Sequence, residues 1–289
     1  DALPIWADFL SMLYDTVGYI ALSNIFLLCG NVGAFLDLVR QDLPNLPDSF
    51  QYFVVLEQLV FGKLEEVPAI NIAPTDRFSP TISFIVSAFA FNYEDPKAFA
   101  THIYRAKNNA KNCQLHSIEL ICDLLIANVY TRVNLLPKAT HILFDIINSS
   151  NAKGLAGVEL LAWYFMSNVH LKERKYDVAY GVINNSIIQL EKNRLHSELL
   201  IMLLNYNLYK VFMFRREFNK AQLCIEQAVA ITQKHEMFFP FDMQPQSYGV
   251  QVSDELMEKI KNGENVEIPE EKKEDFLESL AEKDNEESN

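Results

Sequence analysis

Residues 125–139 read L-I-A-N-V-Y-T-R-V-N-L-L-P-K-A, an apolar run followed by a short polar turn and an alanine. The same order returns in W-Y-F-M-S-N-V-H-L-K-E-R-K-Y-D-V-A at 163–179 and in Y-N-L-Y-K-V-F-M-F-R-R-E-F-N-K-A at 206–221. The closing residues Ala139, Ala179 and Ala221 are 40 and 42 residues apart, and Ala98 precedes the first of them by 41. Such a recurrence predicts a chain built from repeated units.

Each unit has the pattern of two helices. Apolar residues at spacings of three and four follow the alanines and would share one helical face: Ile142, Leu143 and Ile146; Val182, Ile183 and Ile187; Leu223, Ile225 and Val229. An alanine early in the second helix lets two helix axes approach to about 8 Å. The sequence therefore predicts an all-α fold, an α-solenoid of stacked antiparallel helix pairs with a period of about 41 residues.

This pattern resembles the tetratricopeptide repeat family, whose motif has a small residue within the first helix, flanking aromatics, and an alanine early in the second. The resemblance covers residues 115–235 well and 78–108 less well. The matching positions are Ala127, Tyr130 and Ala139; Trp163, Ser167, Tyr176 and Ala179; and Leu208, Phe212, Phe218, Ala221 and Ala228.

The chain departs from that family at several places. Tyr209 stands where a small residue is expected, and Asn151, Glu191 and Gln233 replace the closing proline. The period of about 41 residues exceeds the 34 typical of this repeat and lies near that of HEAT repeats. An irregular helical bundle in which the alanines recur by chance is the alternative interpretation.

The sequence divides into four parts. Residues 1–77 are expected to hold a helix at 1–16, a helix pair at 17–42 that is a degenerate unit with Ala34 as its alanine, and a helix at 49–64. Residues 78–235 would form helix pairs at 80–108, 114–149, 155–192 and 196–235, with a polar break at 148–151. The aromatic, proline-containing segment 236–250 is expected to cap the last pair. Residues 251–289 are an acidic, partly disordered tail with short helices at 254–261 and 270–282.

Charge and composition exclude several classes of function. Of the net charge of −13, residues 251–289 carry −9, and the rest is nearly neutral, so no basic stripe for nucleic acid is expected. The apolar stretch Tyr19–Val39 contains polar residues and a glycine turn, which favours two buried helices over a membrane span. Four cysteines without close pairing indicate a reducing compartment, and an intracellular location, cytoplasmic or nuclear, is expected.

The sequence contains no nucleotide-binding, zinc-protease or nucleophile-elbow motif. Cys113 and His116, with Glu119 and Cys122 nearby, could share a helical face, but an ordinary helix start explains them better than a metal site does. We therefore expect a protein that is not an enzyme and that has no cofactor.

The resemblance also implies a concave groove, formed by the first helix of each pair, that holds partner peptides through polar side chains. In this chain the corresponding residues are Asn128, Arg132, Tyr164, Asn168, Lys172, Tyr206 and Lys210. Asn128 and Asn168 occupy the same place in successive units, and an amide can both donate to and accept from an extended backbone. Leu124 stands where a carboxylate clamp would need lysine, and a solvated polar face is the alternative interpretation.

Two further segments are candidates for docking onto a partner. They carry Phe238, Phe239 and Phe241 in the aromatic segment and Phe276, Leu277 and Leu280 in the tail. The hypothesis that follows is a protein–protein interaction scaffold, a tetratricopeptide-like subunit of a larger complex with one or more protein partners. A peptide-sensing regulator that binds an extended peptide in its groove is the second hypothesis, and an enzyme on a helical scaffold is the third.

Overall fold

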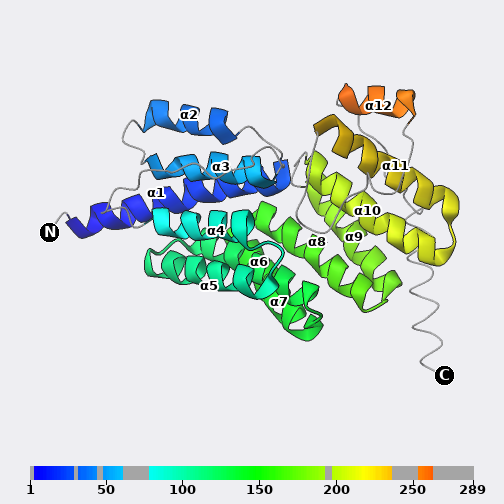
Figure 1. Ribbon diagram of the computed structural model, residues 1–289, viewed down its shortest axis with the longest axis horizontal. Coiled ribbons are helices and arrows are strands. Elements are labelled where there is room, and N and C mark those ends of the chain that lie inside the picture. The colour runs from blue at the N-terminus through cyan, green and yellow to red at the C-terminus, as the bar shows by residue number, and fades with distance from the viewer. Residues whose placement is uncertain are drawn as a thin grey trace.

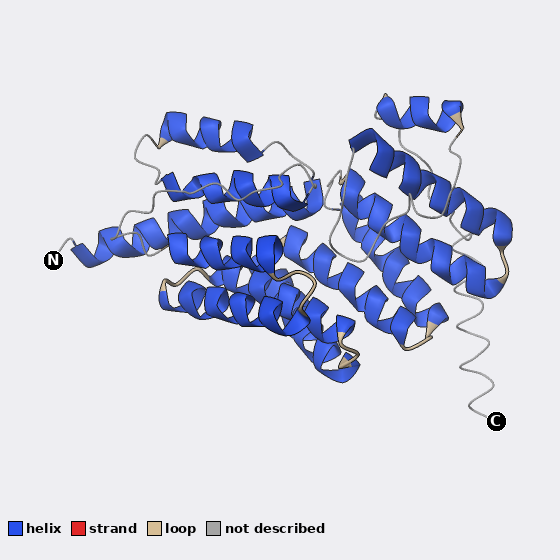
Figure 2. Cartoon of the chain, in the orientation of Figure 1, coloured by secondary structure: helices blue, strands red, loops and turns tan. Residues whose placement is uncertain are grey.

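A computed structural model describes residues 3–28, 32–43, 48–60, 78–192, 197–235 and 253–262. These residues are almost entirely helical, and no strand occurs among them (Figure 2). Helices that follow one another in the chain pack side by side (Figure 1). The predicted all-α class is confirmed.

The N-terminal part begins with α1 (Leu3–Ser23), which continues into a π-helical turn, η1 (Asn24–Leu28). It is followed by α2 (Val32–Asp42), a short 3₁₀ turn η2 (Asp48–Phe50) and α3 (Gln51–Val60). The predicted helix boundary between residues 16 and 17 is wrong, because Leu13, Val17 and Ala21 continue one apolar face along a single helix. The stretch Tyr19–Val39 does divide between two helical segments, as expected.

Four helix hairpins follow, each formed by two packed helices and a short turn. They are α4 (Ser79–Phe91) with α5 (Pro96–Asn112), α6 (His116–Arg132) with α7 (Leu136–Lys153), α8 (Ala156–Lys172) with α9 (Tyr176–Lys192), and α10 (Glu198–Arg215) with α11 (Phe218–His235). A last helix, α12 (Asp254–Lys261), packs on α11. The predicted helix pairs and the predicted helix at 254–261 are thus present.

The predicted break at residues 148–151 is wrong. These residues lie within α7, which runs on to Lys153 and ends where Gly154 takes a left-handed conformation with φ of 69°. Gly154 adopts this conformation without the steric cost of a Cβ atom, so it ends the helix more effectively than the polar run before it.

The same turn recurs along the hairpins. Positive φ angles of 60–69° occur at residues 114, 134, 154, 174 and 216, of which the first four are 20 residues apart. The N–H of the following residue donates to the carbonyl five positions earlier, as from Leu135 to Tyr130 at 2.8 Å and from Lys175 to His170 at 2.9 Å. This bond satisfies a carbonyl at the helix end, as in a Schellman motif. Each helix and its turn therefore occupy about 20 residues.

The repeated alanines differ in their surroundings. Ala139, Ala179 and Ala221 are buried, whereas Ala98 is half-buried. Ala34, expected to be the packing alanine of an earlier unit, is exposed, because α2 turns Val32 and Leu36 inward instead. The small side chain is thus placed for close helix packing in the last three hairpins.

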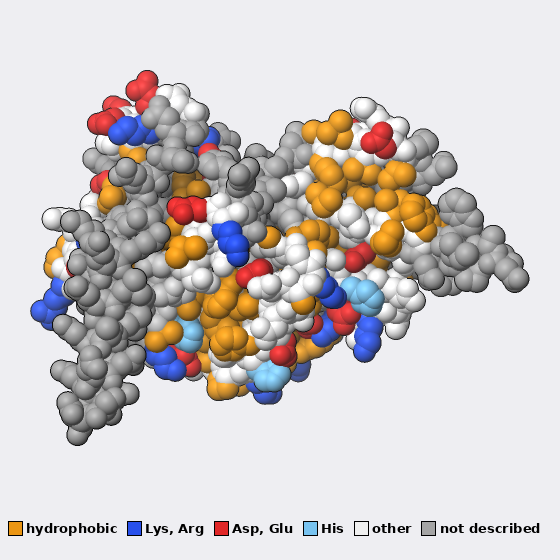
Figure 3. Space-filling model, turned by 180° about the vertical axis from the view of Figure 1, so that it is seen from behind, with side chains coloured by type: hydrophobic (Ala, Val, Ile, Leu, Met, Phe, Trp, Pro, Cys, Tyr) orange, Lys and Arg blue, Asp and Glu red, His pale blue; other side chains and the backbone are white. Residues whose placement is uncertain are grey.

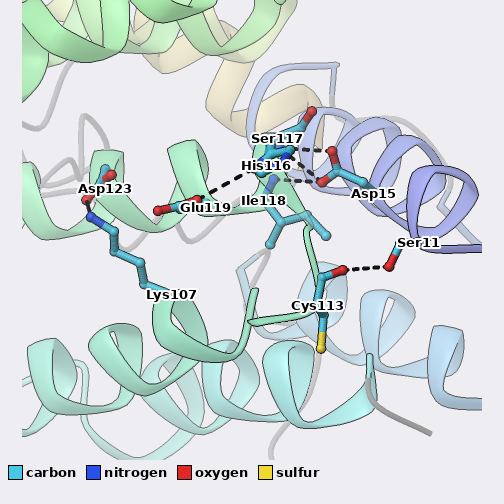
Figure 4. A network of polar contacts seen from close by, with 9 residues as sticks. All are labelled: Ser11, Asp15, Lys107, Cys113, His116, Ser117, Ile118, Glu119 and Asp123. Carbon is cyan, nitrogen blue, oxygen red and sulfur yellow. Dashed lines mark hydrogen bonds and ion pairs between the residues drawn. The ribbon is translucent and has the colours of Figure 1, made fainter. Parts of the chain in front are cut away.

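Helix α1 is joined to the hairpins through polar contacts at the start of α6 (Figure 4). The carboxylate of Asp15 accepts hydrogen bonds from the backbone N–H of Ser117 at 2.9 Å and of Ile118 at 3.1 Å. The Oγ of Ser11 donates to the carbonyl oxygen of Cys113 at 2.6 Å. One hydrophobic core runs from Val17 to Ile231, so the N-terminal helices share it with the hairpins.

Candidate interaction surface

The turns within the hairpins lie next to one another along one edge of the molecule. Lys172, at the end of α8, donates from Nζ to the carbonyl oxygen of Thr131, at the end of α6 (2.8 Å). One hairpin further on, the Arg215 guanidinium donates to Asp177 at 3.0 Å. The rings of Tyr176 and Phe214 stack there with centroids 3.8 Å apart. We call the α6–α7, α8–α9 and α10–α11 turns, with residues 132–138, 172–178 and 213–220, the hairpin edge.

Large apolar side chains are exposed on the hairpin edge. They are Val133, Leu135, Val178, Met213, Phe214 and Phe218, which are 42–61% exposed. In the view from behind, hydrophobic side chains lie beside charged ones along the lower part of the molecule (Figure 3). Single exposed apolar residues are ordinary, but a group of them on adjacent turns is typical of a protein-binding surface.

The hairpin edge is also basic. Its three segments hold eight basic residues, Arg132, Lys138, Lys172, Arg174, Lys175, Arg215, Arg216 and Lys220, against the acidic Glu173, Asp177 and Glu217. This contrasts with the net charge of −13 of the whole chain. The edge thus has a local charge opposite to that of the protein as a whole.

Contacts within the edge hold several of these charges in fixed positions. Arg215 lies over the Tyr180 ring at 4.5 Å while it bonds Asp177. Burial alone would raise the pKa of Glu173, but hydrogen bonds from Lys175 and His170 outweigh it and lower the pKa below the usual range. The carboxylate is thus held between Lys175 and His170, and the turn is closed by the N–H of Lys175, which donates to the carbonyl oxygen of His170 at 2.9 Å.

The basic residues of the expected groove, Arg132 and Lys172, are engaged within the protein. The Arg132 guanidinium donates to the carbonyl oxygen of Tyr93 at 3.0 Å and lies over the ring of that residue at 4.6 Å. Lys172 makes the same kind of contact with Thr131, one hairpin further on. Lys210 lies 4.1 Å from the centroid of the Tyr206 ring. Arg132 and Lys172 thus join neighbouring hairpins, whereas the contact of Lys210 lies within α10.

The remaining predicted groove residues lie deeper than a groove lining would. Tyr164, Tyr206 and Asn128 are 1%, 5% and 8% exposed, so they are not accessible in this structure. The reason is that α6, α8 and α10 are apolar around most of their circumference, and α8 packs against both α6 and α10. Asn168 is half-buried, and its Oδ1 accepts from Asn207 at 2.8 Å.

Asn207 is a residue that the sequence reasoning missed. It lies 39 positions after Asn168 and also donates to Ser167 at 2.8 Å, so the asparagine series continues into a third hairpin. The step of 40 residues from Asn128 to Asn168, repeated as a step of 39 residues to Asn207, could have identified it. The candidate docking residues Phe238, Phe239, Phe241, Phe276, Leu277 and Leu280 lie outside the described residues.

Two other features of the described residues bear on function. Phe9–Phe26 is long and apolar enough to cross a membrane by length and composition, although 33% of it is buried within the fold. Within the described ranges, no group of three or more histidine, cysteine or acidic residues is arranged to bind a metal. His116 and Glu119 are close to Cys113 in the sequence, and the Nδ1 of His116 lies 3.9 Å from the Oε2 of Glu119.

Comparison of the chain with family models, with curated proteins and with solved structures finds no match. The tetratricopeptide resemblance therefore rests on the residues of the chain itself.

Proposed function

We propose that this chain is a non-enzymatic interaction scaffold, a tetratricopeptide-like subunit of a larger multiprotein complex whose partner binds the hairpin edge. The observation that carries this proposal is the set of six large apolar side chains exposed on three adjacent turns, among basic residues. Protein interfaces combine an apolar centre with a polar, charged rim, and both elements are present here.

Rigid support for these side chains favours a preformed surface. Each apolar residue lies on a turn or at a helix end, and the turns are joined to the neighbouring hairpin by the Lys172–Thr131 and Arg215–Asp177 contacts. A surface that is ordered before binding loses less conformational entropy when the partner binds. The affinity is then expected to depend on the contacts of these side chains, because little free energy is spent on ordering the surface when the partner binds.

The solenoid arrangement is part of the same proposal. The second helices of the four hairpins begin at Pro96, Leu136, Tyr176 and Phe218, which corresponds to a period of about 41 residues. Equivalent residues of successive hairpins also contact each other, as Arg132 contacts Tyr93 and Asn207 contacts Asn168. Nearest-neighbour contacts of this kind are what hold a solenoid together.

The test is a comparison of matched surface variants in a pull-down. A tagged chain carrying Val133→Asp and Phe218→Asp is compared with one carrying Phe144→Asp and Ile188→Asp, which alters equally exposed residues away from the turns. We expect the first pair to lower the affinity for a co-purifying protein at least tenfold, and the second to leave it unchanged. Equal retention of the partner by both would exclude the hairpin edge as its site.

A further inference from the structure

We propose that the hairpin edge binds the acidic segment 270–282 of the chain's own tail. This inference rests on the proposed function, because it names an occupant for the same surface. The segment reads E-E-K-K-E-D-F-L-E-S-L-A-E, with six acidic residues and two lysines. Its charge is therefore opposite to that of the basic edge. Because the segment belongs to the same chain, it is closer to the edge than any separate acidic peptide.

The hairpin edge and the acidic segment have opposite charges. The exposed cations Lys138, Arg174, Lys175 and Arg216 are distributed over all three turns of the edge. Elsewhere the second helices of the first three hairpins end in single exposed lysines, namely Lys111, Lys153 and Lys192. An acidic peptide thus contacts several cations at the hairpin edge but only one lysine at the opposite end of each of these helices. At moderate salt this difference favours binding at the edge.

The acidic segment and the hairpin edge also both carry large apolar side chains. Phe276, Leu277 and Leu280 have the spacing of one helical face, and the acidic residues flank them. The hairpin edge has the complementary composition, with Val178, Phe214 and Phe218 exposed among lysines and arginines. Burial of apolar groups at the centre of such a contact provides affinity, and the charges around it provide orientation.

The length of the tail allows the contact. Helix α12 packs on α11 through Leu256, and α11 begins at Phe218 on the hairpin edge. The 18 residues of α11 extend for about 27 Å. The 14 residues from Asn262 to Phe276 reach up to about 46 Å when extended, so the segment spans the distance. A tether of this length raises the effective concentration of the segment to the millimolar range, so a weak site suffices.

Zero-length carbodiimide cross-linking of the full chain tests this contact, because it joins only amines and carboxylates that touch. An equal mixture of ¹⁵N-labelled and unlabelled protein separates links within one chain from links between two. We expect carboxylates of residues 270–282 to link to Lys138, Lys175 and Lys220 at least fivefold more often than to Lys111, Lys153 and Lys192. These links should be within one chain and should decrease severalfold in 1 M salt.

The variant Phe276→Ser with Leu277→Ser and Leu280→Ser leaves every carboxylate of the segment unchanged and removes its three large apolar side chains. We expect it to lower the links to the edge lysines at least fivefold, with the links to the other lysines unchanged. Equal yields at the two sets of lysines, or links only between chains, would overturn the inference. In that case, loss of a partner in the Val133→Asp, Phe218→Asp pull-down would still support the proposed function, so the two failures are distinguishable.

Discussion

The ammonium group of Lys172 lies 2.8 Å from the carbonyl oxygen of Thr131, on the neighbouring hairpin and 41 residues earlier in the chain. The carbonyl oxygen of Arg132 lies 3.3 Å from the same nitrogen. Both carbonyls belong to the last turn of α6, where the helix dipole concentrates negative charge. Lys172 of α8 thus caps the C-terminal end of α6.

We predict that Lys172→Met lowers the free energy of unfolding by about 1–2 kcal/mol, because a hydrogen bond to a charged group contributes about 1.5–3 kcal/mol and the solvent exposure of Lys172 reduces this. Urea unfolding followed by circular dichroism measures the change. The matched control is Lys175→Met, which removes an exposed ion pair with Glu173 and should change stability by less than about 0.5 kcal/mol. Equal effects of the two substitutions would show that Lys172 does not join the hairpins.

A second prediction concerns the attachment of α1. Asp15→Ala removes the acceptor for two N–H groups at the start of α6 and should cost about 1–2 kcal/mol, the value of a charged helix cap. Asp15→Asn is the control, since it keeps an acceptor oxygen and should lose less than half as much. Hydrogen exchange of residues 9–20 should accelerate in Asp15→Ala. Unchanged exchange would mean that apolar packing alone holds α1.

Apolar spacing accounts for what the sequence predicted correctly. Helices with one apolar face and an alanine at the close approach, such as α7 and α9, have a period that local sequence shows directly. The turns gave no such signal in the sequence. A left-handed conformation is usually marked by glycine, but here it is adopted by Gln114, Arg174 and Arg216. Hydrogen bonds at the helix ends stabilise these conformations, and such bonds are visible only in the fold.

The groove residues show a different limit of sequence reasoning. A tyrosine on the first helix of a repeat unit is predicted to line the groove if only the second helix of that unit is assumed to pack against the first. In the structure α8 contacts α6, α7, α9 and α10, so Tyr164 is enclosed. The signal available in the sequence was the apolar character of residues 158–169 on every side, which is typical of a buried helix.

The third prediction tests the packing role of the alanines. Ala179→Leu places three additional carbons between closely packed helices and should cost about 1–3 kcal/mol. Ala98→Leu is the control within the same series, because Ala98 is only half-buried and overpacking costs apply to a well-packed core; it should cost less than about 1 kcal/mol. Thermal unfolding measures both. If Ala98→Leu cost as much stability as Ala179→Leu, the first hairpin would not differ from the third in how closely its alanine is packed.

The fourth prediction follows from two buried thiols. Burial raises the pKa of Cys224 from 9.0 to about 12, and burial, aided by the charge of Asp123, raises the pKa of Cys122. At pH 8.5 the native chain should therefore protect both thiols from iodoacetamide, whereas the half-buried Cys113 reacts. Mass spectrometry locates the modified residues, and fast alkylation of Cys224 in native protein would contradict its burial.

The same thiols make stability depend on pH. A group with a raised pKa in the native state contributes stability that is complete below its unfolded pKa, here 9.0, and is lost as pH rises towards the native value of about 12. At pH 10 the thiol of Cys224 ionises in the unfolded chain only, which costs about 1.4 kcal/mol. We expect Cys224→Ala to lose less stability than the parent between pH 8.5 and pH 10, by about this amount, in urea unfolding under reducing conditions. Parallel pH profiles for the two proteins would show that Cys224 ionises equally in both states.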